Sequence, residues 1–333
     1  MKAKIIGCGI SGIVSGVLLK KRGYDVEIFD TKSHVGGNCY DEKIDGVTVH
    51  KYGLHIFHTN DDQVWEFVNR YSAFNNYTHR ARANTRYGLV SIPYNHSTRD
   101  KIGKDLSAEE IQEAIFKDYS ERHWGISWED LPKSISGRLP SKRDNYDDRY
   151  FTDKYQGIPV GGYASMLNNM LDGIKVHLNV EKDYYKKIID DPTNSLVVYT
   201  GKPDAFFDYT YGKLEYRSLR FEHSVAKKTD LFSWDSGAVV NECNNLSFNR
   251  TVDNSIFLNE QVENTILTRD YPEEHNEHND PMYPKNFGNN LDTFAQYNKL
   301  IKNKNKVVFL GRLATYKYLD MWMAIKQVLT KLS

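Results

Sequence analysis

The chain has few cysteines, no long apolar run and no excess charge. Its 333 residues include three cysteines, Cys8, Cys39 and Cys243, which fit no zinc-binding spacing. So sparse and odd a set is typical of a reducing compartment, so we expect a cytoplasmic protein without a metal site. No run of about 18 apolar residues is present, which predicts that no segment spans a membrane.

The balance of charge argues against two further classes of partner. Lysine plus arginine and aspartate plus glutamate both number 44, so the formal net charge is zero. Without a global positive field we expect neither nucleic acid nor an anionic membrane as a partner. A net charge of zero still allows a local basic pocket for phosphate. The glycines between residues 7 and 12 interrupt the apolar start of the chain, which argues against a secretory signal.

The first thirty residues have the pattern of a dinucleotide-binding unit. A short apolar strand, KAKII, precedes the motif GCGISG (7–12), and a helix pattern with an apolar face follows. A second strand, DVEIF, leads to Asp30. The glycines would let the backbone approach a pyrophosphate at the helix N-terminus, and the carboxylate would accept hydrogen bonds from a ribose. The segment therefore predicts a dinucleotide cofactor.

Two further strings favour FAD over NAD. HVGGN (34–38) follows the second strand, and a Gly-Gly pair there resembles flavoproteins of the glutathione-reductase and amine-oxidase type. Near the end of the chain, VVFL (307–310) precedes GRLATYKYLDM (311–321) and a helix pattern for which Asp320 would be the N-cap. A helix N-terminus beside the flavin would stabilise the negative charge of the reduced ring.

The string KYGLHIFHTN (51–60) places His55 and His58 three residues apart. On a strand these side chains point to opposite faces, so they would not easily chelate one metal ion. One buried histidine and one hydrogen-bonded histidine is the simpler interpretation.

Six strings together carry a resemblance to one family. In chain order they are HVGGN, KYGLHIFHTN, DRYFTDKYQGIPVGGY (148–163), VVYTGKPDAFFDY (197–209), LEYRSLRFE (214–222) and GRLATYKYLDM. By these strings the chain is identified as a member of the UDP-galactopyranose mutase family.

The resemblance implies an isomerase that interconverts UDP-galactopyranose and UDP-galactofuranose with no net redox change. In that family, reduced flavin N5 attacks the anomeric carbon, UDP leaves, the sugar–flavin adduct opens and recloses, and UDP returns. It thus implies non-covalent FAD that is active when reduced, a UDP-sugar substrate, and a reductant that is NAD(P)H or a reductase. A related nucleotide-sugar, such as UDP-N-acetylgalactosamine or a deoxy-hexose derivative, is the alternative substrate.

The resemblance also implies the residues of the site. The expected catalytic group is Arg138, Arg250, His58, Tyr318 and Asp320. The expected substrate contacts are His79, Tyr119, Ser120, Trp124, Arg138, Tyr150, Asn241, Arg250, Tyr283 and Tyr318. The expected FAD contacts are Gly7, Gly9, Ser11, Gly12, Asp30, Thr31, Gly36, Gly37, Asn38, His55, Ile56, Arg312, Leu319, Asp320 and Met321. The arginines would hold the diphosphate, aromatic rings would stack on uracil, and phenols would donate to phosphate without adding charge.

Three features depart from the family pattern. The stretch 96–117 is short, where other members have several more helices that in bacterial enzymes form part of the dimer contact. His79 stands where an asparagine is expected near the uridine, Thr315 replaces a usual glutamate, and Trp322 follows the string DM. We therefore expect a monomer or an atypical dimer, and the exact sugar and nucleotide stay open.

The expected fold class is α/β, with a discontinuous Rossmann-like FAD-binding domain, a small helical insert and an antiparallel sheet that carries the substrate. The expected ranges are 1–78, 160–203 and 303–333 for FAD, 96–137 for the reduced helical domain, and 79–95, 138–159 and 204–302 for the sheet.

Two other function classes compete with a mutase. A flavin oxidase of the amine-oxidase type would share the first forty residues and the last helix, but it would not need two diphosphate arginines or a uracil-stacking tyrosine. A nucleotide-sugar binding protein without catalysis is the third reading. In that case the catalytic residues would have been lost, but the string YKYLD, Arg138 and Arg250 are retained and argue against it.

Overall fold

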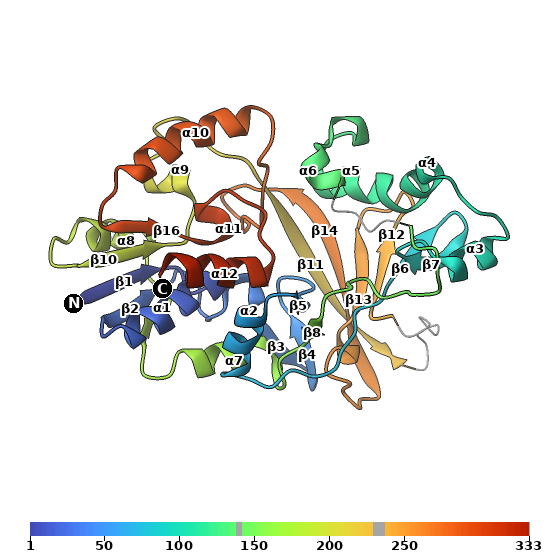
Figure 1. Cartoon of the computed structure of the whole chain (residues 1–333), viewed down its shortest axis with the longest axis horizontal. Coiled ribbons are helices and arrows are strands. Elements are labelled where there is room, and N and C mark those ends of the chain that lie inside the picture. The colour runs from blue at the N-terminus through green and yellow to red at the C-terminus, as the bar shows by residue number, and fades with distance from the viewer. Residues whose placement is uncertain (138–141, 229–236, 333) are drawn as a thin grey trace.

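The computed structural model describes residues 1–137, 142–228 and 237–332, and two sheets organise them (Figure 1). The first sheet is parallel and contains the N-terminal strand. Its order is β16 (Val307–Phe309), β10 (Leu196–Tyr199), β1 (Lys2–Ile6), β2 (Asp25–Phe29) and β9 (Lys175–His177). The predicted Rossmann-like part of the fold is confirmed.

Helices α1 (Ile10–Lys21) and α12 (Met321–Lys331) pack against each other beside this sheet. The predicted helix at the end of the chain begins where expected, with Asp320 at its N-cap position. Its apolar face is buried in the core at Ile325, Val328 and Leu329. The last strand and helix are thereby brought back to the glycine motif at the start of the chain.

The second sheet has seven strands and extends away from the first (Figure 1). Its order is β15 (Tyr283–Pro284), β11 (Tyr216–Lys227), β14 (Asn264–Glu274), β13 (Arg250–Asp253), β12 (Val239–Glu242), β6 (Ala81–Thr85) and β7 (Gly88–Ile92). The expected sheet was antiparallel, but β12 pairs with β6 in parallel. These two strands are far apart in the chain, so no hairpin fixes their relative direction.

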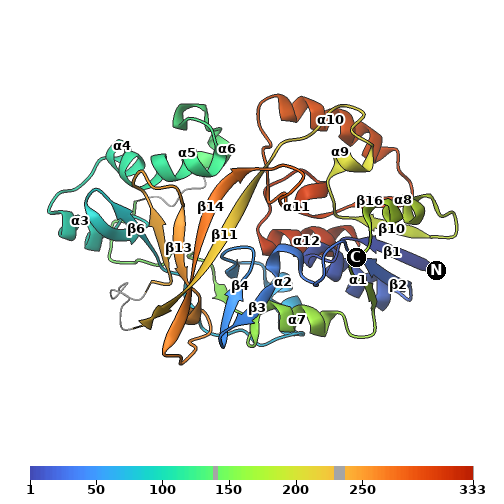
Figure 2. The ribbon, with the colours of Figure 1, turned by 180° about the vertical axis from the view of Figure 1, so that it is seen from behind.

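Short helices cover the part of the second sheet farthest from the N-terminus, as both views show (Figures 1 and 2). They are α3 (His96–Ile102), α4 (Ala108–Ile111), a π-helical turn (Gln112–Lys117), α5 (Asp118–Trp124) and α6 (Lys133–Ser136). A separate apolar core, which includes Ala83, Ile92, Ile115 and Phe116, joins them to β6 and β7. The insert is therefore a layer packed on the sheet.

Smaller elements complete the described fold. Strand β5 (Phe57–Thr59) pairs with β8 (Tyr155–Gly157), so in the described residues the expected sheet segment 138–159 joins the histidine string instead of the large sheet. The other elements are β3 (Asp41–Ile44), β4 (Val47–His50), α2 (Asp62–Asn69), α7 (Gly162–Met170), α8 (Lys182–Asp190), α9 (Pro203–Phe206), α10 (Asn289–Lys302) and α11 (Gly311–Ala314). The domain boundaries stay a prediction.

The Gly-Gly pair of PVGGY has a local reason. Gly161 and Gly162 both have positive φ (83° and 88°), and the Asp41 carboxylate accepts hydrogen bonds from the backbone N–H groups of Tyr163 (2.5 Å) and Ala164 (2.9 Å). A Cβ on Gly162 would lie 2.7 Å from Asp41 Oδ2. The glycines therefore let one carboxylate cap the N-terminus of α7.

None of the described helices combines the length and the apolar character that a bilayer-spanning helix requires.

Candidate functional site

A cleft of about 1490 Å³ lies at the carboxyl ends of the strands of the parallel sheet, where such folds bind nucleotides. Most of the residues expected to contact FAD line it. They are Gly7, Gly9, Ser11, Asp30, Thr31, Gly36, Gly37, Asn38, His55, Arg312, Leu319, Asp320 and Met321. Gly12 and Ile56 lie outside the lining, and their contact with the cofactor stays a prediction.

The glycines of the cleft form a cradle that side chains would fill. A Cβ on Gly7, whose φ is 105°, would lie 1.9 Å from Thr200 Oγ1, and a Cβ on Gly37 would lie 3.0 Å from the Cα of Gly9. A Cβ on Gly12 would lie 1.9 Å from the Gly7 carbonyl oxygen, so Gly12 serves the packing of α1 on its own loop. Bare backbone at the start of a helix suits a diphosphate, so the chain fits the cofactor that the motif predicts.

Asp30 is oriented by the backbone around it. Its Oδ2 accepts a hydrogen bond from Cys8 N–H (2.6 Å), and its Oδ1 accepts one from Lys32 N–H (2.9 Å). The first bond ties the glycine loop to the end of β2. A carboxylate oxygen can accept more than one hydrogen bond, so both oxygens keep capacity for ribose hydroxyls.

Arg312 holds the strand-to-helix junction near the end of the chain. Its Nε and Nη2 donate to the Leu319 carbonyl (3.0 and 2.6 Å), and its Nη1 donates to the Met282 carbonyl (3.3 Å). The guanidinium lies 5.3 Å from the ring centre of Tyr283 and 5.0 Å from that of Tyr318. These two rings are nearly parallel, with centres 5.8 Å apart. Arg312 therefore positions both tyrosines at the edge of the cleft.

Arg250 forms a nearly buried ion pair in the second sheet. Its Nε lies 2.6 Å from Asp270 Oδ2, and its side chain is 17% exposed while that of Asp270 is 3% exposed. The strand register places Arg250 opposite both Asp270 and Asn241, so the three residues occupy neighbouring strands at one level of the sheet. Burial opposes the charge of Arg250, but the carboxylate of Asp270 and nearby phenols raise its pKa above the ordinary value. Arg250 is thus a fixed cation.

Three phenols surround this cation. Arg250 Nη2 donates to the Tyr119 hydroxyl (2.7 Å), and Tyr150 and Tyr283 lie close enough to interact with its charge. Burial raises the pKa of Tyr150 and Tyr283 to about 12 and that of Tyr119 well above its ordinary value. All three therefore stay neutral hydrogen-bond donors at physiological pH.

Three histidines near Arg250 are held neutral. Burial lowers the pKa of His79 and His123 to about 3 and that of His55 to about 4, and the charge of Arg250 contributes to each shift. Arg250 therefore supplies positive charge to this region without help from the imidazoles.

These lowered pKa values predict an acid-sensitive fold. In the unfolded chain a histidine takes up a proton below about pH 6.5, whereas folded His79 and His123, which are 4% and 8% exposed, resist protonation until about pH 3. The unfolded state thus binds more protons. The contribution of these histidines to the free energy of unfolding is therefore at its maximum above pH 6.5 and falls as the pH drops below it. At pH 5 each group lowers it by about 2 kcal/mol.

Urea unfolding at several pH values, with FAD in constant excess, measures this loss. His123→Gln should flatten the pH dependence, whereas the same change at His278, whose side chain is 85% exposed, should leave it unaltered. A free energy of unfolding that stays constant from pH 7 to pH 5 would contradict the assignment of buried neutral histidines.

His58 is fixed by residues that sequence reasoning missed. Its Nδ1 lies 3.0 Å from Asp153 Oδ2, and its ring stacks on Phe151 with ring centres 3.7 Å apart. Asn60 Nδ2 donates to the other oxygen of Asp153 (2.8 Å). A proton on Nδ1 is thereby favoured, which leaves Nε2 as the acceptor. Asp153 belongs to the quoted string DRYFTDKYQGIPVGGY, but only the β5–β8 pairing brings it to His58.

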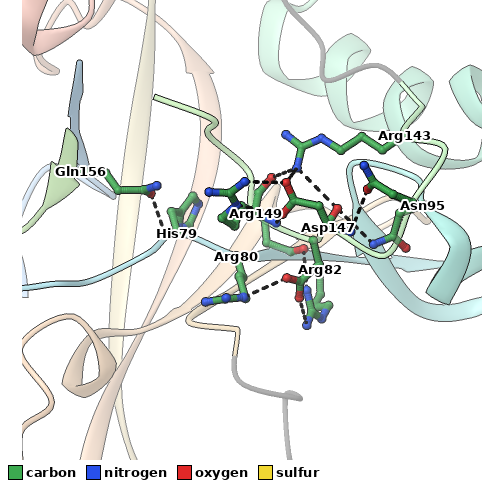
Figure 3. A network of polar contacts seen from close by, with 11 residues as sticks. His79, Arg80, Arg82, Asn95, Arg143, Asp147, Arg149 and Gln156 are labelled. Atoms are coloured by element: carbon green, nitrogen blue, oxygen red, sulfur yellow. Dashed lines mark hydrogen bonds and ion pairs between the residues drawn. The ribbon is translucent and has the colours of Figure 1, made fainter. Parts of the chain in front are cut away.

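A polar network surrounds His79 and the segment that follows the undescribed residues (Figure 3). His79 N–H donates to Gln156 Oε1 (3.1 Å), and its carbonyl accepts from Tyr150 N–H (2.8 Å). Asp148 pairs with Arg80 (2.9 Å), just before β6, and with Arg82 (3.0 Å), within β6. These bonds hold the segment around Tyr150 against the start of β6.

Asp147 forms contacts within the same segment, residues 143–149. Arg149 Nε and Nη2 each lie 2.9 Å from an Asp147 carboxylate oxygen, and Arg143 Nη1 donates to the Arg149 carbonyl (2.5 Å) (Figure 3). Arg138, the second expected diphosphate arginine, lies outside the described residues. Its contact with a substrate stays a prediction.

Ser120 and Trp124, expected at the uridine, are buried on α5. Arg217, from the string LEYRSLRFE, donates through Nε to the His123 carbonyl (2.7 Å) and through Nη2 to the Arg122 carbonyl (2.9 Å) at the end of α5. Gly125 follows with a φ of 67°, and a Cβ there would lie 2.7 Å from Arg217 Nη1. Arg217 thus caps the helix C-terminus and holds α5 on the sheet.

The expected substrate residues and the large cleft do not coincide. Of the expected substrate contacts in the described part of the chain, none lines the cleft; Tyr119, Tyr150, Asn241 and Tyr283 gather around Arg250 instead. The structure therefore presents a dinucleotide cleft and, beside it, a separate cationic and aromatic cluster. Two of the members of that cluster that we missed are Asp270 and His123, both buried polar residues on otherwise regular elements.

Among residues 1–137, 142–228 and 237–332, no three histidine, cysteine or carboxylate side chains gather in the geometry of a metal site.

Comparisons with known proteins agree on one family. The family model described as UDP-galactopyranose mutase matches residues 114–318, and the model described as NAD(P)-binding Rossmann-like domain matches residues 5–71. A dTDP-fucopyranose mutase of Escherichia coli is 31% identical over 98% of this chain and 96% of its own. A UDP-galactopyranose mutase of Mycoplasma pneumoniae is 29% identical over 98% and 94%.

The fold matches as well. A crystal structure of reduced UDP-galactopyranose mutase superimposes with a TM-score of 0.76 at 13% identity and covers 99% of this chain and 93% of its own. The sequence match over more than half of the chain and the near-complete alignment with relatives lead to one conclusion: the chain belongs to the UDP-galactopyranose mutase family.

Proposed function

We propose that the protein interconverts the pyranose and furanose forms of a nucleotide-sugar, with UDP-galactose as the preferred substrate. The observation that carries the proposal is the Arg250 cluster. A fixed cation, a phenol at 2.7 Å and further neutral phenols stand beside a dinucleotide cleft. An oxidase of amines would have no use for a diphosphate-binding cation there.

The cleft suits FAD bound without a covalent bond. Gly7, Gly9 and Asp30 would hold its diphosphate and ribose, and the N-terminus of α12 with Arg312 would face the ring end. Reduced FAD would supply the nucleophile of the reaction. No histidine or cysteine of the sequence sits at a spacing that we can tie to a flavin linkage, so acid precipitation should release the flavin from the protein.

The cluster would bind and retain the nucleotide. Arg250 would pair with a phosphate oxygen, while Tyr119, Tyr150 and Tyr283 would donate neutral hydrogen bonds to others. Because Asp270 already balances the charge of Arg250, this arrangement favours a bound diphosphate through directed donors more than through excess charge. His58, with Nδ1 held by Asp153, would present Nε2 as an acceptor to the sugar.

A product assay tests the proposal. The purified protein is reduced with dithionite and offered UDP-galactopyranose, UDP-N-acetylgalactosamine and dTDP-fucopyranose, and furanose products are separated by chromatography. We expect a furanose from UDP-galactose at the highest kcat/KM. Absence of any furanose product from a reduced, FAD-loaded protein would refute the proposed activity.

The specific observation that favours a second substrate is the likeness to the dTDP-fucopyranose mutase. A higher kcat/KM for dTDP-fucopyranose would transfer the proposal to that substrate without changing the reaction class. Oxygen consumption with a panel of amines tests the oxidase alternative in the same preparation.

The short insert favours a monomer, with a dimer through another interface as the alternative. In the described part of residues 96–137 no large apolar side chain is among the exposed ones, so this surface lacks the apolar patch that a stable dimer contact needs. Light scattering should give a mass close to the 38.6 kDa of one chain. A dimer whose cross-links fall within 96–137 would contradict this prediction.

A further inference from the structure

An ion pair joins the two sheets at the cleft. Lys32 follows β2 two residues after Asp30, and Asp280 lies in the loop between β14 and β15. Lys32 Nζ and Asp280 Oδ2 are 2.7 Å apart, although 248 residues separate the two in sequence. Both side chains line the cleft. The pair is thus one point where the lining from the first sheet meets the lining from the second, and Lys202 Nζ with His275 Nε2, 3.1 Å apart, forms another.

The Lys32 side chain is held in place by an aromatic group. Its Nζ donates to the Tyr52 hydroxyl (3.1 Å) and lies 4.4 Å from the centre of that ring. Tyr52 is fixed in turn by His34 Nε2 (2.7 Å), whose ring stacks on Tyr40 with ring centres 4.0 Å apart. Burial lowers the pKa of Lys32, but the hydrogen bond and charge of Asp280 outweigh burial and raise it, so the lysine stays charged.

The backbone beside Asp280 is hydrogen-bonded to strand β11. Ser218 Oγ donates to the Asp280 carbonyl (2.7 Å), and Met282 N–H donates to the Arg217 carbonyl (2.9 Å). The Met282 carbonyl also accepts from Arg312. The loop is thus fixed at its base, and the Lys32–Asp280 pair adds a side-chain contact from the loop to the segment after β2.

The pair is accessible enough to open. The side chain of Lys32 is 23% exposed and that of Asp280 is 41% exposed, so water can replace each partner. Half-exposed pairs of this kind are weak and sensitive to salt. Such a contact can close a cleft without making ligand release prohibitively slow.

We propose that Lys32 and Asp280 form a latch that closes the cleft over the adenosine half of the dinucleotide and slows its release. The inference rests on the proposed function, because it takes FAD as the occupant. The position follows from Asp30, which is two residues before Lys32, lines the same cleft and is the residue expected to bind the cofactor ribose. Lys32 acts here through Asp280 and not as a direct phosphate ligand.

Release of FAD from the full chain tests the latch. The loaded protein is diluted into excess apo-glucose oxidase, which captures released FAD, and the oxidase activity that appears gives the rate of FAD loss. We expect release to be about threefold faster in Lys32→Ala and about tenfold faster in Lys32→Glu, where two carboxylates face each other. The charge swap Lys32→Glu with Asp280→Lys should restore slow release. High salt should speed release in the natural sequence and have little effect in Lys32→Ala.

Lys51 provides a matched control. It forms a half-exposed pair with Glu42 (3.2 Å) on the adjacent β3–β4 ribbon, but neither residue lines the cleft. Lys51→Ala should therefore release FAD at the natural rate. Thermal melts of all variants without FAD separate lost stability from lost retention.

The outcomes separate the latch from the proposed function. A protein that holds FAD but loses it at the natural rate in Lys32→Glu overturns the latch alone. A charge swap that releases FAD as fast as the single reversal also overturns it, because Lys32 would then contact the cofactor directly. A protein that binds no flavin overturns both proposals.

Discussion

Replacement of Arg250 by alanine should weaken UDP binding about tenfold to a hundredfold, because a charge-assisted hydrogen bond to phosphate contributes about 1.5–3 kcal/mol. Turnover should fall at least as far, since the departing diphosphate is stabilised by the same group. The structure adds a second effect. Asp270, with 3% of its side chain exposed, would lose its ion-pair partner, and breaking such a pair costs about 3–5 kcal/mol of folding stability.

The two effects can be separated by removing the stranded carboxylate. UDP affinity, measured by titration calorimetry, is compared between Asp270→Asn and the double variant Arg250→Ala with Asp270→Asn. The loss between these two proteins belongs to the contact with UDP, because neither retains a buried unpaired carboxylate. Urea unfolding beside it reports the stability of each.

Arg220 is the matched control in the same sheet. It pairs with Glu222 and Glu273, lies 4.2 Å from the ring centre of Tyr271, and is 48% exposed. Arg220→Ala should keep both UDP affinity and turnover. Equal UDP affinity in Asp270→Asn and the double variant would refute the role of Arg250 and weaken the family alignment that placed it.

Oxidation of the flavin should abolish turnover, which is the largest effect that we expect. Reduced FAD would supply the attacking lone pair, and the phenols of the Arg250 cluster cannot replace it, because their raised pKa values keep them protonated. The assay compares air-oxidised and dithionite-reduced protein with the same nucleotide-sugar, and the rate of furanose formation is the readout.

UDP binding to the oxidised protein is the control for that assay. Because Arg250 and its phenols lie outside the large cleft, UDP affinity should change little between the two redox states. An oxidised protein that turns over as fast as the reduced one would exclude a reduced-flavin nucleophile. Loss of UDP binding on oxidation would instead point to a change of shape at the cluster.

Local patterns of the sequence were enough to predict the Rossmann-like unit. The strand, the glycine motif and Asp30 lie within thirty residues, and each feature depends on neighbours along the chain. The last helix was also predictable, because its apolar spacing and Asp320 mark its face and its start. The role of Gly12 could not be predicted from the motif alone. The motif names it with the other glycines, but only the packing of α1 shows that it contacts the Gly7 carbonyl and lies outside the cleft.

The second sheet was harder to predict, since its strands come from segments far apart in the chain. The parallel pairing of β12 with β6 contradicts a purely antiparallel sheet, and nothing local to either strand sets their direction. The roles of Asp153 and Asp270 were missed for a related reason. Each has an ordinary sequence context, and each becomes informative only when its partner, His58 or Arg250, is placed beside it.

By itself the sequence determined the fold class, the dinucleotide unit and, through six matching strings, the family. These follow from short-range periodicity and from motifs whose geometry is set by adjacent residues. Only the tertiary structure decided that Arg250 is paired with Asp270, that His79 and His123 are neutral, and that Lys32 reaches Asp280 across the cleft. Charge state, pairing and access to water depend on burial and on long-range contacts, which no local pattern specifies.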